Sequence, residues 1–380
     1  MVRNGIDRIK EFDKVLAGKR LGLITSVSGV DCSLRSTIDI LAQEYQLAVL
    51  FSPEHGVRGN VDAGGEVETY TDSYTGIPVY SLYRKESKRL TREMLKEIDA
   101  VVYDIQDLGV RYYTFISTMY YAMQACEHYE KEFIVFDRLN PLGDKVEGNL
   151  IEKEKESFIG AYPLCMRYGL TVGELAGMIY EEQGFHFPLT VIPIEGWNRN
   201  SIFPETGNLW VMPSLGIPRF ETALLYPGTC LFEGSNLSEG RGTSAPFEII
   251  GAPYVDGYKF AYHMNSKKLP GVLFTPAYFT PTTSKHEKKN CQGVHIHVTD
   301  SHALCSAELG LALLYAFREC YPKEFAFLPP LKEGSRRSIE LLFGNDRILD
   351  ENVSFESLLE EYHKDSREFY ERKKKFHLYD

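Results

Sequence analysis

The feature that most constrains the fold of this chain is an alternation of apolar runs and helical patterns through its first half. Six short runs, rich in aliphatic and β-branched residues, predict buried strands: 20–25, 47–51, 78–83, 100–105, 133–137 and 189–194. Four intervening stretches show helical spacing or capping signals: 36–45, 91–98, 113–131 and 171–184. Because near-continuous apolar strands alternate with helices, we predict an α/β fold, a mostly parallel sheet with helices on both faces.

The second half has a different pattern. Glycine and proline are frequent from 204 to 282, and a strand is predicted at 293–298. Helices are predicted over 303–319 and, with many charges, over about 354–375. The mixture predicts a smaller α+β C-terminal domain. A chain of 380 residues typically forms two domains, and we place them at 1–225 and 226–380.

Composition and charge narrow the class of partner. The chain is 43% hydrophobic, and its net charge of −11 with scattered basic residues argues against a nucleic-acid partner. No stretch approaches the roughly 18–20 apolar residues of a membrane span, and the first residues, MVRNGIDRIKEF, lack the apolar segment of a signal peptide. The seven cysteines show no paired spacing, which predicts free thiols in a reducing compartment. We therefore expect a cytoplasmic protein without membrane contact; its oligomeric state is not predicted.

Polar side chains follow four of the predicted strands. The carboxyl ends of parallel strands meet at one edge of a sheet, where ligands bind. The acids that follow these strands, with a histidine and an amide beside them, are Glu54, His55, Asp104, Asp107, Asp137, Asn140 and Glu195. The convergence predicts a polar site at that edge.

The densest of these segments is SPEHGVRG (52–59). Glu54 could serve as a general acid, because a carboxyl at the end of a buried strand can be desolvated and keep its proton. His55 could orient Glu54 or touch a ligand, and Arg58 could bind an anionic group. The alternatives are a solvated loop acid, a structural histidine and a surface arginine.

Three further segments carry candidate residues. The segment YDIQDLGVRYYTF (103–115) could form the floor of a polar pocket, or its acids could pair internally with the arginine. Its candidate residues are Asp104, Gln106, Asp107, Arg111 and Tyr112 or Tyr113. The segment 137–149, with Asp137 and Asn140, could equally be a turn-rich connector. The glycine-rich NLSEGRGT (236–243) offers few packing reasons for charges, so a functional role is favoured for its polar residues, Asn236, Glu239 and Arg241.

Several familiar sites do not match the sequence. It contains no GxGxxG dinucleotide fingerprint, no GxxxxGK[ST] phosphate loop, no HExxH zinc motif and no GxSxG elbow. His295 and His297 could bind a metal, but a satisfied polar strand face explains them better. We therefore predict no cofactor and no metal. Carboxylates, arginines, amides and aromatic rings remain, which is typical of carbohydrate-active sites.

Six motifs in order carry a resemblance to a known family. They are SPEHGVRG (52–59), DAGG (62–65), YDIQDLGVRYYTFISTM (103–119), DRLNPLGDKVEGN (137–149), YPGTCLFEGSNLSEGRGT (226–243) and PFEIIGAPY (246–254). Together they resemble the exo-β-N-acetylmuramidase family, long catalogued as a domain of unknown function. The resemblance implies a Rossmann-like catalytic domain, a smaller accessory domain and a cleft between them. It also implies release of N-acetylmuramic acid from the non-reducing end of peptidoglycan fragments such as the muramyl disaccharide.

The resemblance assigns provisional roles. Glu54 corresponds to the family's PEHG glutamate and is the expected catalytic acid, with Asp104 or Asp107 orienting the substrate's acetamido group if that group is the nucleophile. A direct carboxylate nucleophile and inversion through water stay open. The lactyl carboxylate of muramic acid suits a bidentate arginine, for which the candidates are Arg58, Arg111 and Arg241. A non-catalytic muropeptide-binding protein and a nucleotide-dependent Rossmann-type enzyme are the alternatives.

Overall fold

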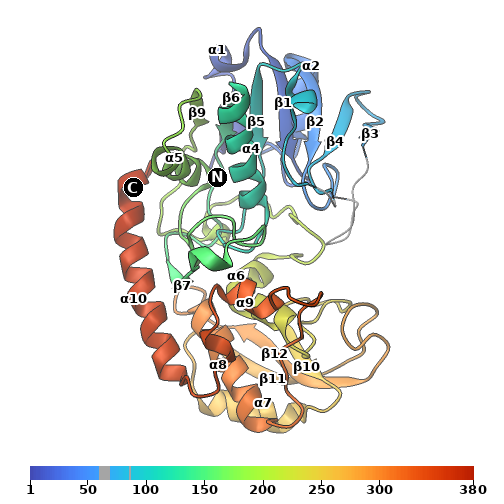
Figure 1. Cartoon of the computed structure of the whole chain (residues 1–380), viewed down its shortest axis with the longest axis vertical. Helices are drawn as coiled ribbons and strands as arrows, with labels where there is room; N and C mark the ends of the chain where they lie inside the picture. The colour runs from blue at the N-terminus through green and yellow to red at the C-terminus, as the bar shows by residue number, and fades with distance from the viewer. Residues whose placement is uncertain (60–68, 85–86) are drawn as a thin grey trace.

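The computed structural model describes residues 1–59, 69–84 and 87–380, so the DAGG motif (62–65) lies outside the described residues. Figure 1 shows two bodies stacked along the long axis. We call residues 1–219 the large body and residues 220–353 the small body.

The large body is built on a sheet of seven strands in the order β3-β4-β2-β1-β5-β6-β9. The strands are β1 (Arg20–Thr25), β2 (Gln46–Ser52), β3 (Tyr70–Thr71), β4 (Pro78–Ser81), β5 (Ala100–Asp104), β6 (Glu132–Phe136) and β9 (Leu189–Ile192). Every neighbouring pair is parallel except the short edge strand β3, which runs antiparallel to β4. The mostly parallel sheet is confirmed, and each predicted strand is present.

Alternate residues of the strands pack into two separate cores. On β5, Val101 and Tyr103 belong to the core that contains α4 (Phe115–Tyr129) and α5 (Val172–Gln183). Val102 points the other way, into the core that contains α2 (Thr37–Glu44). Since successive strand residues face opposite sides of a sheet, the helices cover both faces, as predicted.

Helix boundaries follow the capping signals closely. Thr171 and Glu174 form the predicted capping box at the start of α5, and Gly184 ends that helix in the left-handed conformation at φ 63°. Thr91 caps the short α3 (Arg92–Leu95). Two antiparallel strands, β7 (Glu147–Leu150) and β8 (Cys165–Arg167), lie apart from the main sheet.

The small body contains a three-stranded antiparallel sheet in the order β10-β12-β11. Its strands are β10 (Ile249–Ala252), β11 (Val272–Phe279) and β12 (Cys291–Val298), and its helices are α6 (Phe220–Thr229), α7 (Gly257–Ser266), α8 (Ser306–Cys320) and α9 (Ser338–Phe343). The smaller C-terminal domain is confirmed. No helix is predicted from the sequence within the glycine- and proline-rich stretch 204–282, and α6, which includes Pro227, and α7 both lie there. Gly228 and Gly310 touch where α6 crosses α8, and a side chain at either position would collide with the other helix.

The last helix joins the two bodies. Figure 1 shows α10 (Phe355–Lys373) running beside the small body and returning the C-terminus to the large one. There the Tyr379 hydroxyl donates to Asp137 Oδ2 at 2.5 Å. The domain boundary at 225 and 226 stays a prediction. In the described part of the chain, no helix combines the length and the apolarity needed to cross a bilayer.

Candidate active site

A cavity of about 580 Å³ lies between the two bodies and is lined by residues of both. Its volume is in the usual range for small-molecule sites. The large body supplies loops that follow β2 and β5, and the small body supplies the segment after α6 and the loop between β11 and β12. In the described part of the chain, the carboxylates that line this cavity are those of Glu54 and Glu233.

Glu54 lies two residues beyond the end of β2, at the carboxyl edge of the sheet. Its Oε2 accepts a hydrogen bond of 2.6 Å from Thr114 Oγ1. Tyr83 also lines the cavity, and burial together with the neighbouring charge of Glu54 raises the pKa of Tyr83 to about 12. Tyr83 therefore stays protonated at neutral pH and is available as a hydroxyl donor beside Glu54.

Among the described residues that line the cavity, three that are not glycine have left-handed backbone conformations, which residues with a side chain rarely adopt. They are His55 at φ 72°, Phe247 at φ 61° and Ser284 at φ 69°. Non-glycine residues with positive φ are uncommon and, in a bulky residue such as Phe247, strained. Strain of this kind persists only where surrounding contacts impose it, and it clusters at ligand sites.

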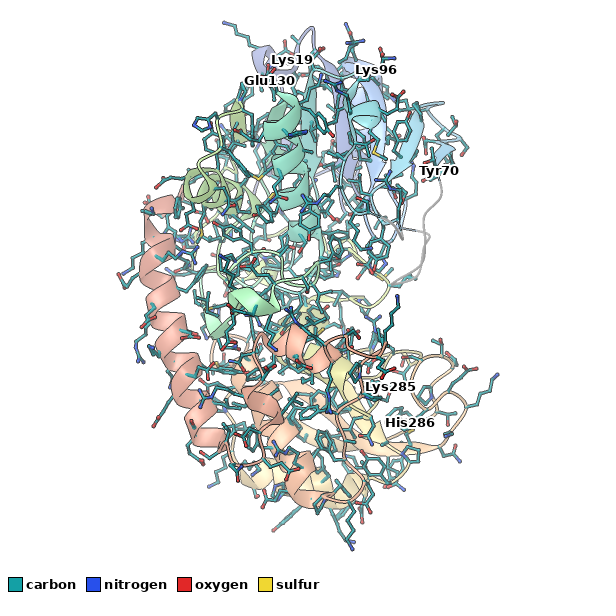
Figure 2. All side chains as sticks on the ribbon, viewed as in Figure 1. Lys19, Tyr70, Lys96, Glu130, Lys285 and His286 are labelled. Atoms are coloured by element: carbon teal, nitrogen blue, oxygen red, sulfur yellow. The ribbon has the colours of Figure 1, made fainter. Side chains whose placement is uncertain are left out.

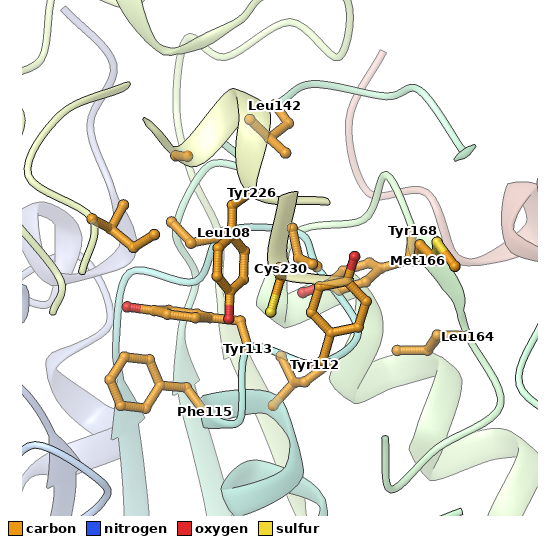
Figure 3. Packing of buried hydrophobic residues seen from close by; sticks show 14 of the residues in the cluster. Leu108, Tyr112, Tyr113, Phe115, Leu142, Leu164, Met166, Tyr168, Tyr226 and Cys230 are labelled. Carbon is orange, nitrogen blue, oxygen red and sulfur yellow. The ribbon is translucent and has the colours of Figure 1, made fainter. Parts of the chain in front are cut away.

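Aromatic rings form one wall of the cavity. Tyr113 packs edge-on against Phe115 with ring centroids 5.0 Å apart and against Tyr226 at 5.9 Å, and Figure 3 shows the three rings together. Tyr226 in turn meets Phe247 at 4.8 Å. His55 meets Phe115 edge-on at 6.3 Å. The wall therefore joins α4 of the large body to α6 of the small body and offers apolar faces on which a sugar ring can stack.

The small body also contributes a cluster of four charged side chains, which are those of Glu233, Glu239, Arg241 and Lys285. Arg241 donates from Nε and Nη2 to Glu233 Oε1 at 2.9 and 2.7 Å, and its guanidinium lies over the Phe247 ring. Arg241 Nε is 3.7 Å from Glu239 Oε1, and Lys285 Nζ is 2.7 Å from Glu239 Oε2. Figure 2 labels Lys285 in the loop that joins β11 and β12. Burial and the charge of Glu239 raise the pKa of Glu233, although Arg241 opposes that rise.

The sequence matches two family models that together span most of the chain. The N-terminal model of exo-β-N-acetylmuramidase NamZ covers residues 21–221, and the C-terminal model covers residues 224–379. The chain belongs to the exo-β-N-acetylmuramidase family. The resemblance of the six motifs is thereby confirmed, as is the expectation of a glycosidase.

Individual relatives agree over the full length. The peptidoglycan β-N-acetylmuramidase NamZ of Bacillus subtilis is 43% identical over 385 residues, covering 100% of this chain and 91% of that protein. A crystal structure of a DUF1343 family protein from Bacteroides fragilis is 37% identical and superposes with a TM-score of 0.90, covering 100% of this chain and 99% of that one. A second such protein from the same organism is 27% identical with a TM-score of 0.79 and the same coverage.

For this exo-β-N-acetylmuramidase family member, the structure brings four of the predicted site residues into the cavity. They are Glu54, His55, Tyr113 and Arg241, and Glu239 lies directly behind Arg241. The sequence placed Glu54 and Arg241 about half a chain apart, and the stacking of the two bodies puts them in one cavity.

The predicted acids of β5 and β6 do not reach it. Asp104 is fully buried and accepts from Arg138 Nε at 2.6 Å and Nη2 at 2.9 Å, and Thr37 donates to it as well. Asp137 is fully buried under Thr171, Gly173 and Tyr379, all of which donate to it. Both carboxylates serve the architecture at the sheet edge, so the expectation that they line the cleft is corrected.

Asp107 and Arg111 are also buried outside the cavity lining. Tyr168 and the Gly109 amide donate to Asp107. Arg111 has no exposed surface and donates to four backbone carbonyls, those of Asn149, Leu164, Leu342 and Phe343. Neither pairs with the other as the structural alternative supposed. Arg111 instead ties the large body to the segment around α9.

Three more predicted residues are engaged elsewhere. Arg58 forms two hydrogen bonds of 3.1 and 3.0 Å with Asp72, whose pKa falls to about 2 mainly because of them. The Asn140 amide donates to Leu170 O and accepts from Leu142 N, so it holds a turn. Asn236 donates to Glu324 O and accepts from Tyr254 OH. Within the described chain, none of these three lines the cavity.

The crevice at the sheet's switch point is nearly closed. Parallel sheets of this type bind nucleotides outside the strands where the order reverses, here β1 and β5. The space there, beside Ser28, Gln106 and Arg138, measures about 40 Å³. This space is much smaller than the cavity of about 580 Å³ between the two bodies, so the switch point lends little support to the nucleotide-dependent alternative.

Sequence reasoning missed Glu233, Tyr83, Thr114, Tyr226 and Lys285. Glu233 interrupts the apolar run CLF just before Gly234, and a charge in such a run was an available signal. Tyr226 and Glu233 both lie in a motif that carried the family resemblance. Lys285 lies in a loop with no distinctive pattern, and nothing in its sequence neighbourhood marks it.

Proposed function

We propose that this chain hydrolyses the glycosidic bond of a terminal N-acetylmuramic acid at the non-reducing end of peptidoglycan-derived fragments. Glu54 protonates the leaving oxygen, and the enzyme needs no cofactor for that step. The observation that carries the proposal is the position of Glu54 in one cavity with Arg241, in a chain that matches the two exo-β-N-acetylmuramidase family models over most of its length.

Arg241 is the proposed anchor for the lactyl carboxylate. Of the three arginine candidates, it alone lines the cavity, because Arg58 is paired with Asp72 and Arg111 is buried. Nε and Nη2 of Arg241 are occupied by Glu233. In the chain outside 60–68 and 85–86, no acceptor is bonded to Nη1, so that nitrogen can receive a ligand carboxylate. N-acetylglucosamine lacks this group, so the contact would discriminate between the two sugars.

We also propose that the enzyme works in the cytoplasm, on imported disaccharides and short fragments released during cell-wall recycling. All seven cysteines are free thiols in the structure, which suits a reducing compartment. Fractionation of the source cells with an antibody to the chain tests this part, and recovery mainly outside the cytoplasm would contradict it.

The deciding experiment compares a 4-nitrophenyl N-acetylmuramide with the matching N-acetylglucosaminide. We expect the wild type to release nitrophenol from the muramide only, and Glu54→Gln to lower turnover by about a hundredfold or more, the usual scale for losing acid–base help. Glu93→Gln, which changes an exposed acid of α3, is the matched control and should keep full turnover.

Three other results of this experiment would contradict parts of the proposal. Binding of the muramyl disaccharide without release from either glycoside would favour the non-catalytic binding protein. Equal release from both glycosides would remove the lactyl group from recognition. Normal turnover by Glu54→Gln would remove Glu54 from the mechanism.

A further inference from the structure

Among the residues that the structure describes, each body contributes one carboxylate to the lining of the cavity. Glu54 follows β2 of the large body, and Glu233 lies near the end of the short 3-10 helix Cys230–Gly234, which continues α6 of the small body. Glycosidases with an acid residue on one side of the bond place a second carboxylate on the other. The sequence offered Asp104 or Asp107 for that second position, and the structure buries both outside the cavity.

Glu233 is held in a way that leaves one oxygen for a ligand. Both donors of Arg241 end on Oε1, at 2.9 and 2.7 Å. Among residues 1–59, 69–84 and 87–380, the hydrogen-bond donor to Oε2 is the Cys230 thiol at 3.8 Å, a weak donor. The side chain is 32% exposed, whereas its neighbour Glu239 is 2% exposed. Glu233 is therefore fixed at one oxygen and accessible at the other.

The surrounding charges explain why an acid can be kept there. Glu233 and Glu239 share Arg241, and Lys285 supplies the second positive charge through Glu239 Oε2 at 2.7 Å. Lys285 Nζ also donates to Phe232 O at 2.6 Å and Ser235 O at 3.0 Å, the carbonyls on either side of the Glu233–Gly234 pair. The two negative charges of Glu233 and Glu239 are thus matched by the two positive charges of Arg241 and Lys285. Lys285 also holds the backbone on either side of Glu233.

We propose that Glu233 is the second catalytic carboxylate and accepts the proton of the nucleophile that attacks the anomeric carbon. The inference rests on the proposed function. As the bond from the anomeric carbon to the leaving oxygen breaks, the proton of Glu54 passes to that oxygen. The nucleophile forms the new bond to carbon and gives its own proton to Glu233 Oε2. That nucleophile is water, through its O–H, or the substrate's acetamido group, through its N–H.

The test uses leaving-group dependence, which a merely structural role would not produce. Glu54→Gln and Glu233→Gln are compared on a nitrophenyl muramide, with a good leaving group, and on the muramyl disaccharide, with a poor one. A lost acid matters most when the leaving group is poor, whereas a lost proton acceptor slows both substrates. We expect Glu233→Gln to lose about a hundredfold or more on both, and Glu54→Gln to lose far more on the disaccharide. Glu221→Gln, an acid of α6 whose side chain is 51% exposed, is the matched control and should keep full turnover.

Folding and binding are checked in parallel. Glu233→Gln should melt cooperatively and bind N-acetylmuramic acid within about threefold of the wild type, since Gln keeps an acceptor for Arg241. If it does not fold, Glu233→Asp serves instead, because it retains a carboxylate but shortens its reach, and the same loss on both substrates is expected.

The anomer that the wild type first releases, detected by NMR, identifies the nucleophile. Inversion indicates water. Retention, together with inhibition by a thiazoline analogue of the sugar, indicates the acetamido group.

Three results would overturn the inference. The first is turnover by Glu233→Gln within threefold of the wild type on both substrates. The second is a leaving-group dependence equal to that of Glu54→Gln. The third is a sugar covalently attached to Glu233 in a trapped intermediate, which would make it a nucleophile rather than a proton acceptor. If the wild type itself releases nothing, the proposed function fails, and that failure is distinct from these three.

Discussion

Both hydrogen bonds that Arg241 donates to Glu233 end on the same oxygen, at 2.9 and 2.7 Å. This geometry has two consequences for the cavity. It immobilises a carboxylate while leaving its second oxygen accessible, and it turns the remaining nitrogen of the guanidinium, Nη1, toward Gly216 on the cavity wall. One arginine can thus position a catalytic group and receive a substrate group at the same time.

Replacing Arg241 should remove the preference for muramic acid. We expect Arg241→Met to weaken binding of N-acetylmuramic acid by about 10–100-fold, the range of hydrogen bonds to charged groups, and to change binding of N-acetylglucosamine by less than about threefold. Titration calorimetry with the two free sugars measures both. Arg58→Met is the comparison, because Arg58 is paired with Asp72 outside the cavity. The reverse pattern, with Arg58 controlling the muramic acid affinity, would reinstate the anchor expected from the sequence.

Lys285 should act as a positioning residue. Lys285→Met removes the partner of Glu239 and the donor that holds the carbonyls of Phe232 and Ser235. Glu233 would lose its fixed orientation, so we expect kcat to fall about tenfold or more while KM changes little. Steady-state kinetics on the nitrophenyl muramide gives both constants. The control is Lys288→Met in the same loop, whose side chain is 84% exposed. A rise in KM at constant kcat would instead place Lys285 in substrate binding.

Arg111 should be required for stability. Arg111→Met would remove the guanidinium donor from four backbone carbonyls, of which Leu164 O and Phe343 O keep a second donor, from Ile151 N and Asn149 Nδ2. We expect the free energy of unfolding to fall by about 3 kcal/mol or more. Urea unfolding measures the loss, with the exposed Arg92→Met as control. Because Arg111 lies outside the cavity, turnover per folded molecule should change little. Unchanged stability would show that the buried guanidinium contributes nothing net.

Asp107 should make stability depend on pH. Burial raises the pKa of Asp107 to about 7, whereas an unfolded aspartate titrates near 4. Between these values the folded state binds the extra proton, so the free energy of unfolding falls as pH rises, by up to about 1.4 kcal/mol per pH unit, and levels off above pH 7. The amide side chain of the Asp107→Asn variant cannot titrate, so its free energy of unfolding should fall less steeply with pH, by up to about 1.4 kcal/mol per pH unit.

Urea unfolding at several pH values from 4.5 to 8.5 compares the two proteins. The difference between them isolates Asp107 from the other titrating groups. Parallel curves would mean that Asp107 is ionised in the folded protein throughout this range. That result would be understandable only if the bonds from Tyr168 and Gly109 outweighed the burial of the carboxylate.

Much of the fold was predictable because its causes are local. The six strands are apolar on both faces, and this follows directly from a parallel sheet covered by helices. Thr171, Glu174 and Gly184 bound α5 through bonds to their own neighbours in sequence. The packing of α6 on α8 was not predictable, because Gly228 there meets Gly310, 82 positions later in the chain.

The sequence by itself determined the class of sheet, the family and the location of Glu54 at a strand's end. These depend on side-chain periodicity and on contiguous motifs, which are properties of neighbours in the chain. Only the tertiary structure decided which polar residues meet a ligand. Asp104 and Glu54 both follow parallel strands, yet Arg138 neutralises the first, while the small body completes a cavity over the second. Exposure and pairing are set by contacts between segments far apart in sequence, so a strand-end acid is a structural ion pair or a catalytic group according to what packs over it.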